Sequence, residues 1–79
     1  MGKTNKLSKE YSLNHVKERM LERHGLTITE KEYDAICTKQ NIKILSEENG
    51  QHVFEAEFKN KNLKFVWCHK RKTVTTVLW

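Results

Sequence analysis

The sequence predicts an α+β domain of 79 residues in which two N-terminal helices pack on a four-stranded antiparallel meander sheet. Two observations predict this class. Up to about residue 37, apolar residues recur at spacings of three and four, which is typical of helices. From residue 41 they recur at every second position in short runs separated by turn residues, which is typical of consecutive antiparallel strands. The helices are therefore expected to cover one face of the sheet.

The first helix is predicted to begin with Ser12 as its N-cap and to end at His24, with Gly25 as a left-handed stop. Residues 1–11 are polar and basic, and we expect them to form a flexible tail that leaves residues 12–79 as a single domain. The apolar stripe of the helix, at spacings of three and four, consists of Leu13, Val16 and Met20.

The second helix is predicted to begin after Thr29, which forms a capping box with Glu32. A first strand is expected at residues 41–45, ended by residues 46–50, where Asn49-Gly50 favours a hairpin turn. Three further strands are expected at residues 51–59, 63–69 and 73–79, joined by turns at 60–62 and 70–72. The side chains expected to be mostly buried are Met20, Ile36, Phe54, Phe58, Phe65 and Trp67.

Net charge is +5, and the charges are unevenly distributed along the chain. Residues 1–24 hold six Lys or Arg and three acids, residues 25–57 hold three and seven, and residues 58–79 hold six and none. If the two chain ends meet in the fold, they create one basic face, which is typical of proteins that bind an anionic partner such as nucleic acid. A merely basic surface is the alternative interpretation.

Three basic side chains follow one another at intervals of four in the first helix: His15, Arg19 and Arg23. At about 100° per residue they form a row beside the apolar stripe. The row should therefore border the interface between helix and sheet. An imidazole followed by two guanidiniums is suited to contact a phosphate.

No segment is apolar enough to span a membrane, so no membrane partner is expected and the cytoplasm is the expected location. Reduced thiols are then expected for Cys37 and Cys68. With His52 and His69 they could supply four metal ligands, but the spacing matches no recognised zinc motif. We therefore expect no metal site and no cofactor.

The element order, the motif His-x-x-x-Arg-Met-x-x-Arg and the terminal segment TVTTV resemble a family of small bacterial and phage domains. That family is of uncharacterised function and is assigned to the superfamily of RelE-like, barnase-like and colicin-type ribonucleases. The likeness covers about residues 12–79, with Val16 where a small Ala is usual and a more basic turn at residues 68–72. The positions that match in register are His15, Arg19, Met20, Glu22, Arg23, Gly25 and, in the last strand, Thr76.

The resemblance implies a toxin-like or phage-encoded ribonuclease that needs no metal, with His15, Arg19, Arg23 and Thr76 as its catalytic residues. RNA carries its own nucleophile, the 2′-hydroxyl, so the protein must supply only a proton-transferring group and phosphate-binding cations. His24, His52, Lys70 and Arg71 are reserve candidates for these roles. The residues expected to bind nucleic acid are Lys17, Lys64, Lys70, Arg71 and Lys72.

The sequence is also compatible with other interpretations. The helix row could be ordinary surface charge, and Thr75 and Thr76 could be there for strand propensity alone. Because side chains alternate along a strand, one of these two threonines should point toward the helices and the other away. The scaffold could also be a non-catalytic module that binds a host protein, a cognate inhibitor or nucleic acid, as a monomer or a small homodimer through an exposed strand.

Overall fold

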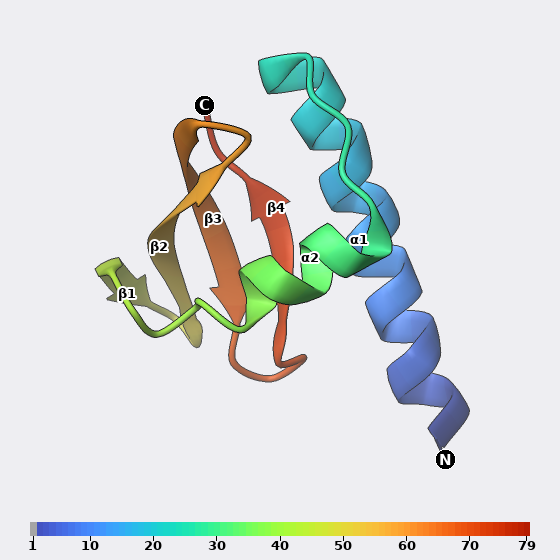
Figure 1. The fold of residues 1–79 in the computed structure, drawn as a ribbon. Helices are drawn as coiled ribbons and strands as arrows, with labels where there is room; N and C mark the ends of the chain where they lie inside the picture. Colours follow the sequence, from blue (N-terminus) through green and yellow to red (C-terminus); the bar gives the residue numbers. More distant parts are fainter. Residues whose placement is uncertain (1) are drawn as a thin grey trace.

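The computed structural model describes the backbone of residues 2–79 and the side chains of residues 10–79. It confirms the predicted α+β architecture, with two helices that precede a four-stranded antiparallel sheet of order β1-β2-β3-β4 (Figure 1). The elements are α1 (Gly2–His24), α2 (Glu30–Cys37), β1 (Ile44–Glu48), β2 (Gln51–Phe58), β3 (Lys61–Cys68) and β4 (Thr73–Val77).

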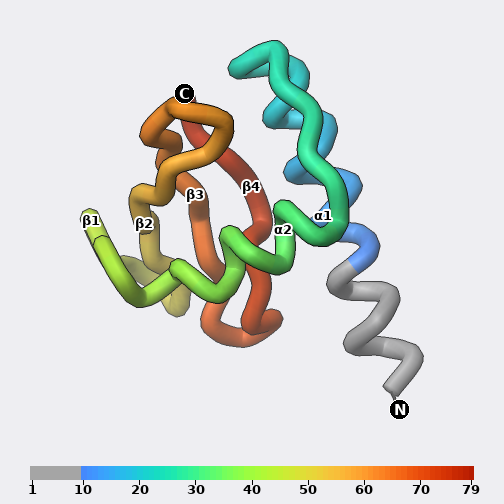
Figure 2. Tube along the Cα trace, in the orientation of Figure 1, coloured from blue at the N-terminus to red at the C-terminus, as the bar shows by residue number. Residues whose placement is uncertain are grey.

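Strand β4 is the part of the sheet that both helices contact. Figure 1 shows α1 running along β4 while α2 crosses the sheet near the same strand, and the Cα trace in Figure 2 shows the same proximity. The basic N-terminal helix and the basic C-terminal part of the sheet are thus neighbours, which is the condition for one basic face. The buried core lies between the helices and one sheet face; α1 contributes Leu13, Val16 and Met20, and the strands contribute Phe54, Ala56, Phe58, Leu63, Phe65, Val74 and Val77.

Helix α1 is longer than predicted, because it begins at Gly2 and not at residue 12. The prediction that Ser12 is the N-cap was wrong, because Ser12 lies inside the helix and is only 1% exposed. Its position explains the burial, since Ser12, Val16 and Met20 are spaced by four and share one face of the helix. Of the predicted tail, the side chains of residues 1–9 lie outside the described part, while Glu10 and Tyr11 are helical and exposed.

The predicted helix boundaries around residue 25 are confirmed. Gly25 has a φ of +66° and donates its N–H to the Leu21 carbonyl at 2.9 Å, which ends α1 in the left-handed conformation that glycine adopts without strain. Thr29 caps α2, and its side chain and that of Glu32 bond reciprocally to each other's backbone N–H. The hydrogen bond from the Thr29 backbone is the main reason that the pKa of Glu32 is lowered.

Strand β1 does not occupy residues 41–45 as predicted but begins at Ile44 and continues to Glu48. The alternation of Ile42 and Ile44 was misleading, because every residue of β1 is exposed and no core fixes its register. The register is set by the hairpin turn, where Asn49 and Gly50 both have the positive φ values predicted for them.

The predicted buried residues lie in the core, with one exception. Phe54, Phe65 and Met20 are fully buried, and Phe58 and Ile36 are nearly so. Trp67 is only partly buried and packs against the edge of the core. The alternation of large apolar side chains in β2 and β3 was therefore a sound guide to the core face of the two central strands.

Candidate functional site

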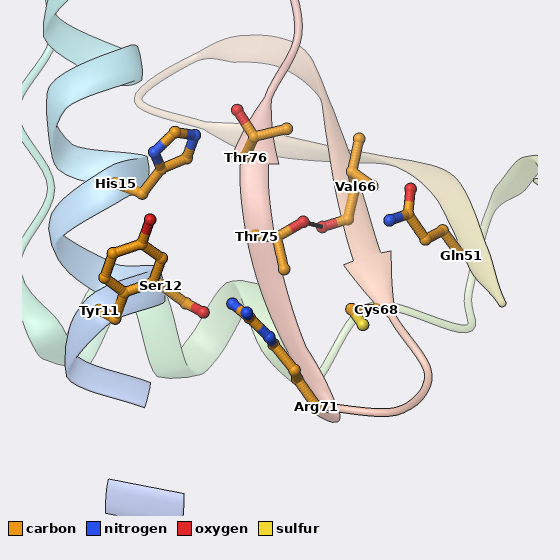
Figure 3. A pocket seen from close by; sticks show the side chains of 9 residues that line it. All are labelled: Tyr11, Ser12, His15, Gln51, Val66, Cys68, Arg71, Thr75 and Thr76. Atoms are coloured by element: carbon orange, nitrogen blue, oxygen red, sulfur yellow. Dashed lines mark hydrogen bonds between the residues drawn. The ribbon is translucent and has the colours of Figure 1, made fainter. Parts of the chain in front are cut away.

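A cavity of about 490 Å³ lies between the middle of α1 and the sheet face that includes Val66 and Cys68 (Figure 3). The helix supplies residues on one side, β2, β3 and β4 supply the other, and the turn between β3 and β4 closes the lower end in the view of Figure 3. The lining residues are Tyr11, Ser12, His15, Gln51, Val66, Cys68, Arg71, Thr75 and Thr76.

Both threonines of β4 line this cavity, so the strict alternation expected for Thr75 and Thr76 was wrong. The reason is a shift in register between β3 and β4: Val66 is opposite Thr76, whereas the next residue, Trp67, is opposite Val74. Thr75 is the extra residue of a β-bulge, and bulges redirect side chains that would otherwise alternate. The Thr75 hydroxyl donates a long hydrogen bond of 3.4 Å to the Val66 carbonyl.

His15 is half-buried, and its ring points from α1 toward Thr76 in Figure 3. From the opposite end, the Arg71 guanidinium lies 5.8 Å from the centre of the Tyr11 ring, a distance compatible with a cation–π interaction. The nine described residues that line the cavity include no acid. The cavity thus combines one titratable imidazole, one guanidinium and several hydroxyls, which is a suitable surface for a phosphate.

Ser12 adds an unusual feature to the helix side of the cavity. Its hydroxyl is buried and has no hydrogen-bond partner among the described residues. Buried polar atoms are normally satisfied by protein or by water, so this hydroxyl has a hydrogen-bonding capacity that the described residues leave unused. In Figure 3 the Ser12 hydroxyl points away from the helix, toward β4 and Arg71.

The structure brings together His15, Thr76 and Arg71 but not Arg19 and Arg23. Arg19 pairs with Glu22 of the same helix at 2.9 Å. Arg23 lies one turn further along, donates to the Val77 carbonyl at 2.7 Å and stacks on Trp79 with 5.5 Å between guanidinium and ring centre. Of the row, His15 lies at the cavity and Arg23 contacts the end of β4, whereas the contact found for Arg19 is with its own helix.

Two further side chains hold β4 in place. The His24 Nε2 hydrogen donates to the Leu78 carbonyl at 2.7 Å, which fixes the chain just beyond the strand. From α2, the Tyr33 hydroxyl donates to the Val74 carbonyl at 2.5 Å and accepts from the Thr73 hydroxyl. Burial raises the pKa of Tyr33 far above its ordinary range and also raises the pKa of the nearby Cys37 thiol.

Sequence reasoning missed Tyr11 and the site role of Ser12. Tyr11 precedes His15 by four residues, so it extends the same row by one turn. Tyr11 was excluded because the helix was predicted to begin at Ser12. The spacing of four residues between Tyr11 and His15 was visible in the sequence, but it could be used only with the correct helix boundary.

The residues predicted to bind nucleic acid lie partly around this cavity. Arg71 lines it, and Lys70 is exposed in the same turn. Lys64 shares the face of β3 that carries Val66 and Cys68, where it lies opposite Glu55 of β2. The remaining two, Lys17 on α1 and Lys72 in the turn, are exposed.

Comparison of the chain with protein-family models, curated proteins and solved structures finds no match. Among the described residues, neither helix is both long and apolar enough to span a membrane. A group of three residues could hold a metal ion, and it combines His52 and His69 with Glu47 rather than with a cysteine.

Proposed function

We propose that this chain is a small ribonuclease that cleaves RNA in the cavity between α1 and β4 without a metal ion. The observation that carries the proposal is the meeting of His15 and Thr76, 61 positions apart in the sequence, with Arg71 in one cavity whose described lining contains no acid. This arrangement supports the ribonuclease resemblance for His15 and Thr76. It assigns to Arg71 the phosphate-binding role that the resemblance implied for Arg19 and Arg23.

The chemistry follows from the groups that line the cavity. His15 removes the proton of a ribose 2′-hydroxyl, whose oxygen then attacks the adjacent phosphorus and forms a 2′,3′-cyclic phosphate. The bond from phosphorus to the 5′-oxygen breaks, and that oxygen takes a proton from water. Arg71 stabilises the charge that builds on the phosphate oxygens, and the Thr76 hydroxyl orients one of them.

Binding should depend on the basic turn next to the cavity. Lys70, Arg71 and Lys72 lie together between β3 and β4, and contacts of such side chains to phosphates release counterions. We therefore expect RNA affinity to fall steeply between low and moderate salt. Affinity that does not change with salt would instead indicate a protein partner. It would contradict the role of the basic turn as the RNA-binding surface.

The decisive experiment incubates the purified chain with a labelled RNA in the presence of a chelator. We expect cleavage by the wild type, a loss of about 10²- to 10⁴-fold in rate for His15→Ala, and no cleavage where a 2′-deoxy nucleotide replaces the attacking ribose. His69→Ala is the matched control, since this exposed histidine lies outside the cavity. Equal cleavage by wild type and His15→Ala would assign the activity to another site or to a contaminant.

A second function is favoured by a separate observation, the exposure of β1. This strand lies at the end of the sheet away from α1, and its five residues are all exposed. An exposed edge strand can pair with a strand of another chain, so a non-catalytic module that binds a host protein, an inhibitor or a second copy would use this edge. Either function suits the reducing cytoplasm, given the two free thiols of Cys37 and Cys68.

A further inference from the structure

Three side chains that are distant in sequence converge near the end of the sheet where β1 and β2 meet the turn after β3. Glu47 of β1 is directly opposite His52 of β2, and His69 follows the last residue of β3. The His52 Nδ1 and His69 Nε2 atoms are 2.7 Å apart, and His69 Nε2 is 3.6 Å from a Glu47 carboxylate oxygen. None of the three lines the cavity of His15.

His52 is held in one orientation by its surroundings. It is only 4% exposed, and its Nε2 lies 2.6 Å from the Gln40 carbonyl oxygen. A carbonyl can only accept, so Nε2 carries a hydrogen, and Nδ1 is the ring nitrogen on the side of His69 that can coordinate a metal. Metal-binding histidines are commonly oriented in this way, with the second ring nitrogen donating to a backbone carbonyl.

The spacing of the three ligand atoms suits a small transition-metal ion. They all lie within 4.8 Å of one another. Around a tetrahedral zinc ion with bonds of about 2.0–2.1 Å, ligand atoms are roughly 3.3–3.4 Å apart. The His52–His69 pair must therefore separate by less than 1 Å, roughly, to admit the ion. His69 can make this movement because its side chain is exposed at the surface.

We propose that Glu47, His52 and His69 bind a zinc ion, which fastens β1 to the turn between β3 and β4. Two imidazoles and one carboxylate are a recognised ligand set for zinc, and water can supply the fourth ligand because Glu47 and His69 are exposed. Such a site would stabilise the position of β1, since this exposed strand contributes no residue to the buried core. A metal bond would supply the attachment to the sheet that packing does not.

The test measures Zn²⁺ binding to the full chain by calorimetry, with Co²⁺ as a spectroscopic probe. We expect one ion per chain and a Co²⁺ spectrum without the thiolate-to-cobalt bands that Cys37 or Cys68 would produce. His69→Ala and Glu47→Gln should each weaken binding at least tenfold. Both residues are exposed, so their replacement should leave the fold intact. His15→Ala is the matched histidine control and should bind zinc as the wild type does.

A second variant gives a change of opposite sign. Lys72 lines the cavity next to the three ligands, and its ammonium group repels a metal ion. Lys72→Ala should therefore bind zinc more tightly than the wild type. Zinc should also slow backbone hydrogen exchange in β1 of the wild type but not of His69→Ala. An absence of 1:1 binding, or binding that His69→Ala and Glu47→Gln leave unchanged, would show that the group is only a hydrogen-bonded network.

Discussion

The two halves of the interface between α1 and β4 are built from the same helix and the same strand, yet they differ in kind. In the half formed by Arg23 and His24, side chains donate to the Val77 and Leu78 carbonyls at 2.7 Å. In the half that contains His15, a cavity separates helix from strand. Each half has one buried polar atom without a described partner, the Ser12 hydroxyl in this half and Nε of Arg23 in the other. We call these the bonded half and the open half.

The difference shows that side chains in the same row of a helix can have different roles. Arg23 is two turns beyond His15 on the same side of α1, but its guanidinium already has a backbone acceptor and an aromatic neighbour. The bulge at Thr75 increases the contrast, because it turns two hydroxyl-bearing residues of β4 into the open half. Stability should thus come mainly from the bonded half and binding from the open half.

The largest effect should come from a core residue of α1 that lies between His15 and Arg23 in the sequence. Met20 is fully buried in α1, and Met20→Ala should lower the free energy of unfolding by about 2–5 kcal/mol. That is a large part of the total for a domain of this size, so this variant should unfold at a lower urea concentration and temperature than the wild type. Met20→Leu conserves volume and should cost less than about 1.5 kcal/mol. Urea denaturation followed by circular dichroism measures both, and equal losses for the two variants would contradict the importance of side-chain volume at this position.

The next effect separates the two halves. Arg23→Ala removes a charged donor from the Val77 carbonyl and should cost about 1.5–3 kcal/mol of stability. Arg19→Ala, which removes only a surface pair with Glu22, should cost no more than about 1 kcal/mol. RNA cleavage per folded molecule should change little in Arg23→Ala. If Arg23→Ala had full stability but did not cleave RNA, Arg23 would have the catalytic role that the resemblance implied.

A third effect concerns the contact of α2 with β4 and appears only at high pH. Burial raises the pKa of Tyr33 and of Cys37 above their ordinary values of 10.0 and 9.0. The unfolded chain then releases these protons at a lower pH than the folded chain does. The resulting stability is present in full below about pH 9 and declines as pH rises further. Tyr33→Phe should show a shallower decline in urea denaturation between pH 8 and pH 11, and parallel profiles would contradict this origin.

Much of the fold was predictable because its signals are local. The capping box of Thr29, the stop at Gly25 and the Asn49-Gly50 turn each depend on a few adjacent residues, and all three are confirmed. The position of β1 was not predictable from alternation, because no residue of that strand is buried. Its register depends on the hairpin partner instead.

The candidate site was predictable only in part. His15 and Thr76 were singled out by the helix row and the strand motif, and the structure brings them together. Tyr11 was missed through an incorrect helix start, and the joint presence of Thr75 and Thr76 required a bulge that alternation cannot reveal. The convergence of Glu47, His52 and His69 depends on strand pairing and has no short sequence motif.

The smallest expected effect has the opposite sign to the others and concerns Ser12. Because its buried hydroxyl lacks a described partner, Ser12→Ala removes an unsatisfied polar group and also raises helix propensity, so stability should increase by about 0.5–1 kcal/mol. If the hydroxyl bonds to a phosphate in the open half, the same variant should weaken RNA binding. Ser46→Ala, in the exposed strand β1, should change neither quantity. A gain in stability together with a loss of affinity would show that the open half is kept unsatisfied for a ligand, whereas a loss of stability would show that Ser12 serves the fold.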